Sequence, residues 1–401
     1  MNNSHPSHAL GGSIFGFVSI IFLLLFTSPV SGYPALTADG FAIPQPGHRF
    51  SFPRDDGAHP DFRIEWWYVT GHLFGPAGRR FGFQATFFRL AGPRGGKELN
   101  VNFSQREVFL AHMALTDVAA GKFWHEERLN REGWDARATV GDLDLRNGEW
   151  SMRRMGTSDA STQLDAVFRA PSRLGGASEP SFALHGGVEA EVSIDLSLTA
   201  LKPLVVFGEN GVSRKGEGAA AASYYLTFSR LQAKGKLTLG TATFAVEGEA
   251  WMDHEISSSQ LGRGQVGWDW ICVQFRNQAR ELMLYRMRRG DGTADPVSRL
   301  QWVGPDGRAV TAGFIWKVES YWKSPHSGAT YPARVRLTTT DPVSGRSVSL
   351  EIEPLVADQE LANPLGGGPY WEGACRVRNA QGDDIGSAYL ELTGYAKVLK
   401  F

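Results

Sequence analysis

Carboxyl groups suited to acid–base chemistry lie inside two stretches whose other residues are typical of β-strands. The first stretch is Glu249-Ala-Trp-Met-Asp-His-Glu255. Because successive side chains of a strand point to opposite faces, Asp253 and Glu255 share one face and His254 lies on the other. A carboxyl group on an apolar face is costly to ionise, so its pKa rises and it becomes a candidate general acid.

The second stretch is Gly267-Trp-Asp-Trp270, which runs on into an apolar sequence. By the same alternation, Asp269 is expected to share a face with Ile271, Val273 and Phe275. It is therefore a second carboxyl group on an apolar strand face.

Segment 257–264, rich in serine and glycine, joins the two stretches. An antiparallel connection would place Asp253 and Asp269 on neighbouring strands, with His254 within reach of the same pocket. Repulsion between two inward-pointing carboxylates would leave one acid and one base near neutrality, unless Arg263 pairs with one of them. These three residues are the catalytic candidates. Structural carboxylates that cap turns or accept indole N–H groups would show the same spacing, and the pattern alone favours neither interpretation.

Aromatic and polar residues elsewhere in the chain could form the walls of such a pocket. The candidates for substrate binding are Trp251, Trp268, Trp270, Glu65, Trp66, Trp67, His112 and Trp371. Together with His254 and the carboxylates Asp253, Glu255, Asp269 and Glu372, they suit proton transfer in an aromatic-lined pocket. The tryptophans would equally suit a pocket that only binds a long apolar ligand. Each tryptophan taken singly is also typical of core filling, and His112 is typical of a core histidine that has found a partner.

The sequence gives no reason to expect a metal or a cofactor. Asp253, His254 and Glu255 are consecutive, and adjacent strand residues cannot all reach one ion without a bulge. The chain has no P-loop, no dinucleotide-binding fingerprint and no zinc-spaced set of Cys and His. A Gly-x-Ser-x-Gly elbow is also absent, which disfavours an α/β-hydrolase.

Composition places the chain among ordinary globular proteins. It has 401 residues, 42% of them hydrophobic and 21% charged, with a formal net charge of −1. This length suggests roughly two domains, and the charge gives no electrostatic reason to expect nucleic acid as a partner. The oligomeric state is not indicated.

The N-terminus has the pattern of a secretory signal. Residues 14–26 form an apolar run too short to span a bilayer comfortably, and small residues follow it up to Gly32. We expect residues 1–32 to be a signal peptide of a secreted or periplasmic protein. No Lys or Arg precedes the run, so an uncleaved anchor is the alternative. In an exported protein Cys272 and Cys375 could pair, and two buried thiols are an equal alternative.

Short alternating stretches bounded by turn residues recur along the whole chain, and no convincing amphipathic helix appears. Residues 61–73 and 80–89, separated by Pro76-Ala-Gly78, are typical of a β-hairpin. The pattern predicts an all-β protein of the barrel or sandwich type. Ala233-Lys-Gly-Lys236 is a plausible boundary between two domains.

Several motifs, in order, resemble the lipocalin-like family of carotenoid 1,2-hydratases and the related secreted AttH-type proteins, often labelled secreted hydrolases. They are Ile64-Glu-Trp-Trp-Tyr68, Trp251-Met-Asp-His-Glu255, Gly267-Trp-Asp-Trp270, Tyr370-Trp-Glu-Gly373 and Leu390-Glu-Leu-Thr-Gly-Tyr395. The resemblance implies two tandem lipocalin-like antiparallel β-barrel domains, at 48–235 and 236–401, and a pocket for a hydrophobic ligand.

The resemblance also implies a reaction, the addition of water across an isolated alkene. This reaction needs an acid that protonates the alkene and aromatic faces that stabilise a carbocation. Asp269, between Trp268 and Trp270, is similar to that arrangement, with Asp253 and His254 orienting or reprotonating it.

The expected partner is a hydrophobic small molecule or lipid of isoprenoid or acyl type, undergoing hydration or hydrolysis, and peripheral membrane contact stays open. A non-enzymatic carrier and a structural protein with filled barrels are the alternatives. Acidic groups converging on an open cavity would favour the enzyme.

Overall fold

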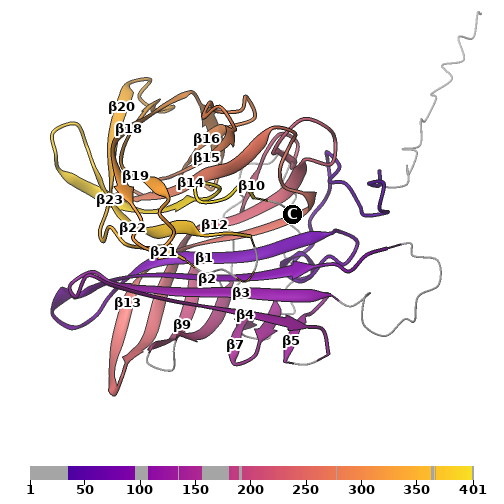
Figure 1. The fold of residues 1–401 in the computed structure, drawn as a ribbon, viewed down its shortest axis with the longest axis horizontal. Coiled ribbons are helices and arrows are strands. Elements are labelled where there is room, and N and C mark those ends of the chain that lie inside the picture. Colours follow the sequence, from indigo (N-terminus) through magenta and orange to yellow (C-terminus); the bar gives the residue numbers. More distant parts are fainter. Residues whose placement is uncertain are drawn as a thin grey trace, which may run out of the picture. The chain divides into compact units, whose positions relative to one another are not determined.

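The computed structural model describes residues 35–94, 107–133, 135–155, 180–188, 192–276, 278–362, 365 and 367–399. They belong to one compact unit, Pro34–Phe401. The predicted signal peptide lies outside the described residues. Two curled antiparallel sheets make up nearly all of the unit, and the regular helical structure in the described part is two short 3₁₀ turns, η1 (Arg54–Asp56) and η2 (Pro76–Gly78) (Figure 1). The expected all-β architecture of two lipocalin-like barrels is confirmed.

The first sheet has 13 strands in the described part of the chain, in the order β4-β3-β2-β1-β13-β12-β9-β8-β7-β6-β5, with β10 and β11 also paired to β12. The strands are β1 (Ile64–Phe74), β2 (Arg80–Leu90), β3 (Val108–Asp117), β4 (Lys122–Arg131), β5 (Ala136–Ala138), β6 (Asp144–Asn147), β7 (Trp150–Met155), β8 (Ser181–Val188), β9 (Val192–Ala200), β10 (Val205–Phe207), β11 (Ser213–Arg214), β12 (Ala222–Leu239) and β13 (Ala242–Ser259).

The second sheet has 10 described strands, in the order β17-β16-β15-β14-β23-β22-β20-β19-β18, with β21 paired to β22. The strands are β14 (Gln265–Phe275), β15 (Glu281–Arg289), β16 (Arg299–Val303), β17 (Ala309–Ala312), β18 (Phe314–Lys323), β19 (Thr330–Thr340), β20 (Ser347–Pro354), β21 (Glu360–Leu361), β22 (Tyr370–Arg378) and β23 (Asp384–Leu392).

The chain passes from one sheet to the other between Ser259 and Gln265. The boundary expected at residues 235 and 236 falls inside β12, which pairs with β13 along nearly its whole length. Lys234 and Lys236 lie on the face of this hairpin end that meets solvent. Ala233 and Leu237 lie on the opposite face and are buried. The lysine and glycine content therefore reflects a half-exposed strand, as alternation allows.

The central pairing of the first sheet joins β1 to β13, with Trp67 opposite His254 and Tyr68 opposite Asp253. Alternation then divides both strands between two environments. Trp67 and Met252 pack into the core inside the first sheet. Tyr68 belongs instead to a buried cluster that also contains residues of the second sheet, including Trp270.

Direct contacts hold the two sheets close together beside this cluster. The His72 ring nitrogen Nε2 lies 2.9 Å from the carbonyl oxygen of Ala388. Gly82 on β2 faces Ala374 on β22 so closely that a Cβ atom at position 82 would lie 2.4 Å from the Ala374 Cβ. Glycine is required here because any side chain would push the sheets apart.

Cys272 and Cys375 are both buried free thiols, so the alternative of a disulfide is wrong. Cys272 lies in the cluster between the sheets, whereas Cys375 lies in the core of the second sheet. The two thiols face different sides of the second sheet. In the described residues, no helix has the length and apolar character needed to cross a membrane.

Candidate active site

A cavity of about 310 Å³ opens between the two sheets. This volume falls at the lower end of the range of about 300–1,000 Å³ typical of small-molecule sites. Strands β1, β2, β3, β12 and β13 of the first sheet and β14, β15, β22 and β23 of the second contribute to its lining. Aromatic residues form much of the wall: Trp66, Tyr68, Phe88, Tyr225, Trp268, Trp270, Tyr285 and Tyr370.

Four carboxyl groups converge on this cavity. Asp253 and Glu255 come from β13 of the first sheet, and Glu372 and Glu391 come from β22 and β23 of the second. All four side chains are buried or nearly so, in a wall that is otherwise largely apolar. Such a concentration of acids in an apolar cavity is costly for folding and is typical of a functional site.

Asp253 is the acid most closely held by the first sheet. Its Oδ1 atom accepts hydrogen bonds from Trp251 Nε1 at 2.7 Å and from the Thr227 hydroxyl, and its Oδ2 accepts one from the Tyr225 hydroxyl at 2.8 Å. Tyr225 in turn accepts a bond from Trp270 Nε1 at 2.8 Å. Burial raises the pKa of Asp253 to about 7, although these three donors lower it. Asp253 is therefore positioned and partly protonated near neutral pH.

Glu255 is the one carboxylate of the four with a cationic partner in the described structure. Lys215 Nζ lies 3.0 Å from its Oε2, and the Ser223 hydroxyl donates to the same oxygen. The Lys215 ammonium also lies over the rings of Tyr225 and Tyr285, at 4.4 and 4.3 Å from their centroids. This ion pair holds the Glu255 carboxylate and the Lys215 ammonium together in the cavity wall.

Glu372 and Glu391 are directly opposite each other on paired strands. Burial, followed by repulsion from Glu391, raises the pKa of Glu372 well above its ordinary value. Burial also raises the pKa of Glu391 to about 7, against a hydrogen bond from Trp268 Nε1 at 3.0 Å that lowers it. The second sheet thus supplies a pair of neighbouring acids.

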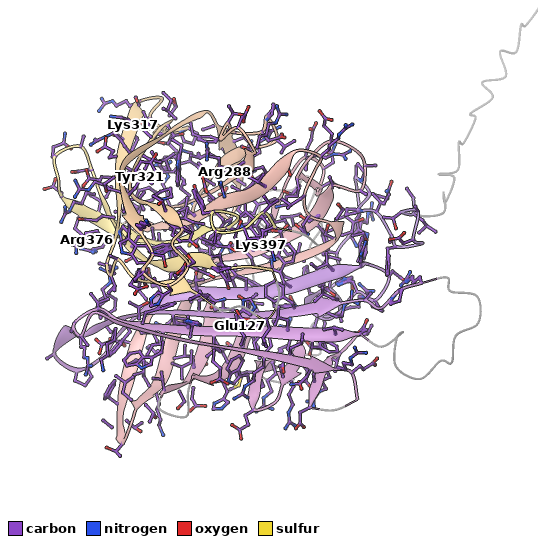
Figure 2. All side chains as sticks on the ribbon, in the orientation of Figure 1. Glu127, Arg288, Lys317, Tyr321, Arg376 and Lys397 are labelled. Atoms are coloured by element: carbon purple, nitrogen blue, oxygen red, sulfur yellow. The ribbon has the colours of Figure 1, made fainter. Side chains whose placement is uncertain are left out.

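His112 lines the cavity as a neutral ring. Its Nδ1 atom lies 2.6 Å from the Tyr370 hydroxyl, and its Nε2 atom lies 3.5 Å from Glu127 Oε1 (Glu127 is labelled in Figure 2). Burial lowers the pKa of His112 to about 3 and raises that of Glu127 to about 7. The imidazole therefore orients Tyr370 without adding a positive charge.

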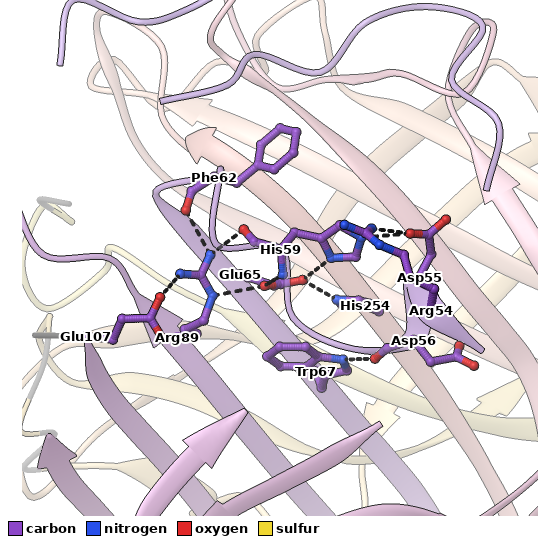
Figure 3. Close-up of polar contacts among 10 residues, drawn as sticks. All are labelled: Arg54, Asp55, Asp56, His59, Phe62, Glu65, Trp67, Arg89, Glu107 and His254. Carbon is purple, nitrogen blue, oxygen red and sulfur yellow. Dashed lines mark hydrogen bonds and ion pairs between the residues drawn. The ribbon is translucent and has the colours of Figure 1, made fainter. Parts of the chain in front are cut away.

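Glu65 and His254 lie on the other faces of β1 and β13, away from the cavity. Glu65 Oε1 lies 2.8 Å from His254 Nε2 and 2.7 Å from His59 Nδ1, and its Oε2 is 3.0 Å from Arg89 Nε (Figure 3). The Trp67 ring stacks on His254 with centroids 4.6 Å apart. These residues form a buried ion-pair cluster on the inner face of the first sheet.

This cluster is also the place where metal-ligating atoms come together in the described structure. The ligand atoms of His59, Glu65 and His254 lie within 4.8 Å of one another. The fully buried Arg89 guanidinium, however, already neutralises Glu65, which also accepts the backbone N–H of His59 at 2.9 Å. A metal ion would compete with a cation fixed beside it, so the arrangement favours a structural network.

Asp269 lies on the face of β14 that points into the second barrel, together with Ile271 and Val273 as its alternation predicts. Its carboxylate is 2.7 Å from Arg286 Nη1 and 3.0 Å from Arg288 Nε. The strands carrying Asp253 and Asp269 are not paired, because β13 pairs with β1 and β12 while β14 pairs with β15 and β23. Asp269 therefore does not line the cavity, and the expected approach of the two aspartates does not occur.

The remaining tryptophans divide in the same way. Trp66, Trp268 and Trp270 line the cavity. Trp251 sits behind Asp253 and orients it through its indole N–H. Trp371 packs in the core of the second sheet and donates its indole N–H to the carbonyl of Ala357.

Sequence reasoning missed the tyrosines, the lysine and Glu391 in this site, and it included Glu372 only as one of several carboxylates. Glu372 and Glu391 stand inside two of the motifs that carry the resemblance. Each lies on a strand face that alternates with core residues such as Trp371 and Leu390. The strand alternation that makes Asp253 a candidate applies to these glutamates as well.

Comparison with known proteins agrees with this architecture. The model of a family described as AttH-like matches residues 43–395. The crystal structure of a protein from Nitrosomonas europaea assigned to AttH superposes with a TM-score of 0.72 at 32% identity, covering 88% of this chain and 100% of the other. Kievitone hydratase from Nectria haematococca shares the fold, with a TM-score of 0.57 at 14% identity over 89% of this chain and 98% of its own. No curated protein gives a significant sequence match. The chain belongs to the AttH-like family.

Proposed function

We propose that this protein binds an apolar molecule between its two sheets and adds water across a carbon–carbon double bond of that molecule. One observation carries the proposal: Asp253, a buried acid with its pKa raised to about 7, lines an aromatic-walled cavity. A carboxyl group that keeps its proton near neutral pH can deliver it to a weak base such as an alkene.

The walls suit the cationic intermediate that this protonation would create. The rings of Trp268 and Trp270 line the cavity, and ring faces attract a developing positive charge. Glu255, held by Lys215, adds a carboxylate to the same wall. Stabilising the cation lowers the barrier for the protonation step, because the charge develops inside a preorganised site.

The relatives are compatible with this chemistry. Kievitone hydratase is named as a hydratase, and the two chains share one fold. The ligand class follows from the cavity itself, whose lining is mostly aromatic and aliphatic with a few convergent acids. We infer an isoprenoid- or acyl-type molecule carrying an isolated alkene.

The test combines binding and turnover in purified protein. A neutral fluorescent probe, N-phenyl-1-naphthylamine, reports occupation of the cavity, and a panel of acyclic isoprenoid alkenes in oxygen-labelled water reports hydration by mass spectrometry. Asp253→Asn should retain probe binding and lose turnover by about 10²–10⁴-fold, the usual contribution of a general acid. Probe binding without hydration of any alkene by the wild type would instead identify a carrier.

A further inference from the structure

Four buried polar atoms of cavity-lining residues lack a hydrogen-bond partner in the described part of the chain: the Tyr68 hydroxyl, Glu372 Oε1, His112 Nε2 and Gln260 Nε2. The first two face the cavity from opposite sheets, Tyr68 on β1 and Glu372 on β22. Only 2% of Glu372 is exposed, and both residues line the cavity. Buried polar atoms almost always have a partner, either in the protein or an ordered water molecule.

The two atoms also belong to the same small region. The Tyr68 hydroxyl approaches the Glu372 carboxyl group and lowers its pKa as a hydrogen-bond donor does, but the geometry between the two is too poor for a well-formed direct hydrogen bond. Polar groups that approach each other without bonding directly are the usual setting for a bridging water. The site therefore suits one bound water molecule.

The other acids of the cavity are already engaged. Glu391 accepts the indole N–H of Trp268, Glu255 is paired with Lys215, and Asp253 accepts three hydrogen bonds. Of these four acids, Glu372 is the one with a buried carboxyl oxygen that has no hydrogen-bond partner in the described part of the chain.

Glu372 and Glu391 cannot both ionise easily. They face each other across β22 and β23, and no cation forms an ion pair with either in the part of the chain that the structure describes. Two neighbouring buried carboxyl groups without a counterion hold one proton between them. The carboxylate of such a pair is a base that can accept one proton more.

We propose that Glu372 and Glu391 form a proton-sharing pair that holds a water molecule against Tyr68 and accepts a proton from it, facing the acid Asp253. This assignment rests on the proposed hydration. Neutral Asp253 gives its proton to one alkene carbon, so the π bond breaks and a C–H bond forms. The other carbon, now cationic, bonds to the oxygen of the held water. A proton of that water passes to the carboxylate of the pair and later returns through solvent to Asp253, so the substrate gains one water molecule.

The water site is tested first by high-resolution crystallography of the wild type, Tyr68→Phe and Glu372→Gln. We expect an ordered water within hydrogen-bonding distance of both the Tyr68 hydroxyl and the Glu372 carboxyl group in the wild type, displaced or lost in Tyr68→Phe. A direct bond between the two side chains, or apolar closure around them, would overturn the water site. This readout does not depend on any substrate.

The shared proton is tested by carbon-13 NMR titration of the glutamate carboxyl groups. Glu391→Gln should move the titration of Glu372 down by about one pH unit or more, since it removes a like charge. Glu351→Gln is the matched control, because Glu351 lies in β20 of the same sheet and faces Arg336 and Arg378 outside the cavity. An unchanged Glu372 titration in Glu391→Gln would refute the sharing.

Turnover separates this proposal from the hydration on which it rests. With an alkene that the wild type hydrates, Glu372→Gln should lower kcat by about 10²–10⁴-fold while probe binding and the Glu351→Gln activity stay unchanged. If the wild type hydrates no alkene, the proposed reaction is wrong. The crystallographic and titration results still decide whether Glu372 binds a water molecule and shares a proton with Glu391. If the Glu372→Gln variant keeps the kcat of the wild type, Glu372 is not the base.

Discussion

Asp253 and His254 are neighbours in the sequence but serve opposite faces of β13. Asp253 lines the cavity between the sheets, whereas His254 bonds to Glu65 on the inner face of the first sheet. Strand alternation therefore separates a candidate catalytic acid from a structural cluster within one motif.

The Glu65 cluster should dominate stability and leave the cavity intact. Glu65→Gln removes the fully buried one of the two carboxylates that pair with the buried Arg89, the other being the partly exposed Glu107. Breaking a buried ion pair by removing one partner costs about 3–5 kcal/mol, because the other charge stays buried. Denaturant unfolding should show this loss, while N-phenyl-1-naphthylamine still binds under conditions where the variant is folded.

Asp384→Asn is the matched control for that loss. Its ion pair with Arg276 is largely exposed, so the free energy of unfolding should change by no more than about 1 kcal/mol. An equal loss in both variants would contradict a special role for the Glu65 cluster.

Asp253 should make the protein less stable as the pH rises from about 4 to about 7. Burial raises its pKa from 3.8 to about 7, so in this window the unfolded chain has released the proton that the folded chain retains. Stability falls with rising pH wherever the folded state binds more protons. Relative to Asp253→Asn, the wild type should lose on the order of a few kcal/mol across the window and change little above it.

The measurement is denaturant unfolding of both proteins at a series of pH values. Taking the difference between them cancels the titration of groups that do not interact with Asp253, such as Glu127. A difference that is constant from pH 4 to pH 8 would show that Asp253 titrates normally in the folded protein.

The alternation of apolar and polar residues predicted which side chains share a strand face, but it did not predict which face lines the cavity. Asp269 lies with Ile271 and Val273, as alternation indicates, yet that face points into the second barrel. Its orientation follows from the pairing of β14 with β15 and β23, and the chain segment before β14 gives no sign of this. The acid expected from the flanking tryptophans is consequently an ion-paired residue.

Long-range pairing explains most of what the sequence could not predict about the site. Asp253 reaches the cavity because β13 pairs with β1, which places it opposite Tyr68 far away in the chain. Glu372 and Glu391 reach it because β22 and β23 pair in register. Short turn signals predicted the hairpins, whereas the approach of the two sheets depends on contacts such as that at Gly82.

Gly82→Ala should loosen the contact between the sheets. The new Cβ would lie 2.4 Å from the Ala374 Cβ, so one sheet has to move. Overpacking of this kind costs about 1–3 kcal/mol and should weaken probe binding in the cavity. Gly313→Ala is the control, since a Cβ there meets nothing within 4 Å. Equal stability of Gly82→Ala and the control would show that the sheets do not approach this closely.

The N-terminal segment should be removed during export. Residues 14–26 form an apolar run followed by small residues up to Gly32, which is the pattern of a cleaved secretory signal. Mass spectrometry of the protein from a secreting bacterial host should show a chain beginning at or near Tyr33. Replacing Val30 and Gly32 by large residues should block cleavage, because signal cleavage requires small side chains at these positions. A full-length chain that starts at Met1 and stays with the membrane fraction would instead identify the segment as an anchor.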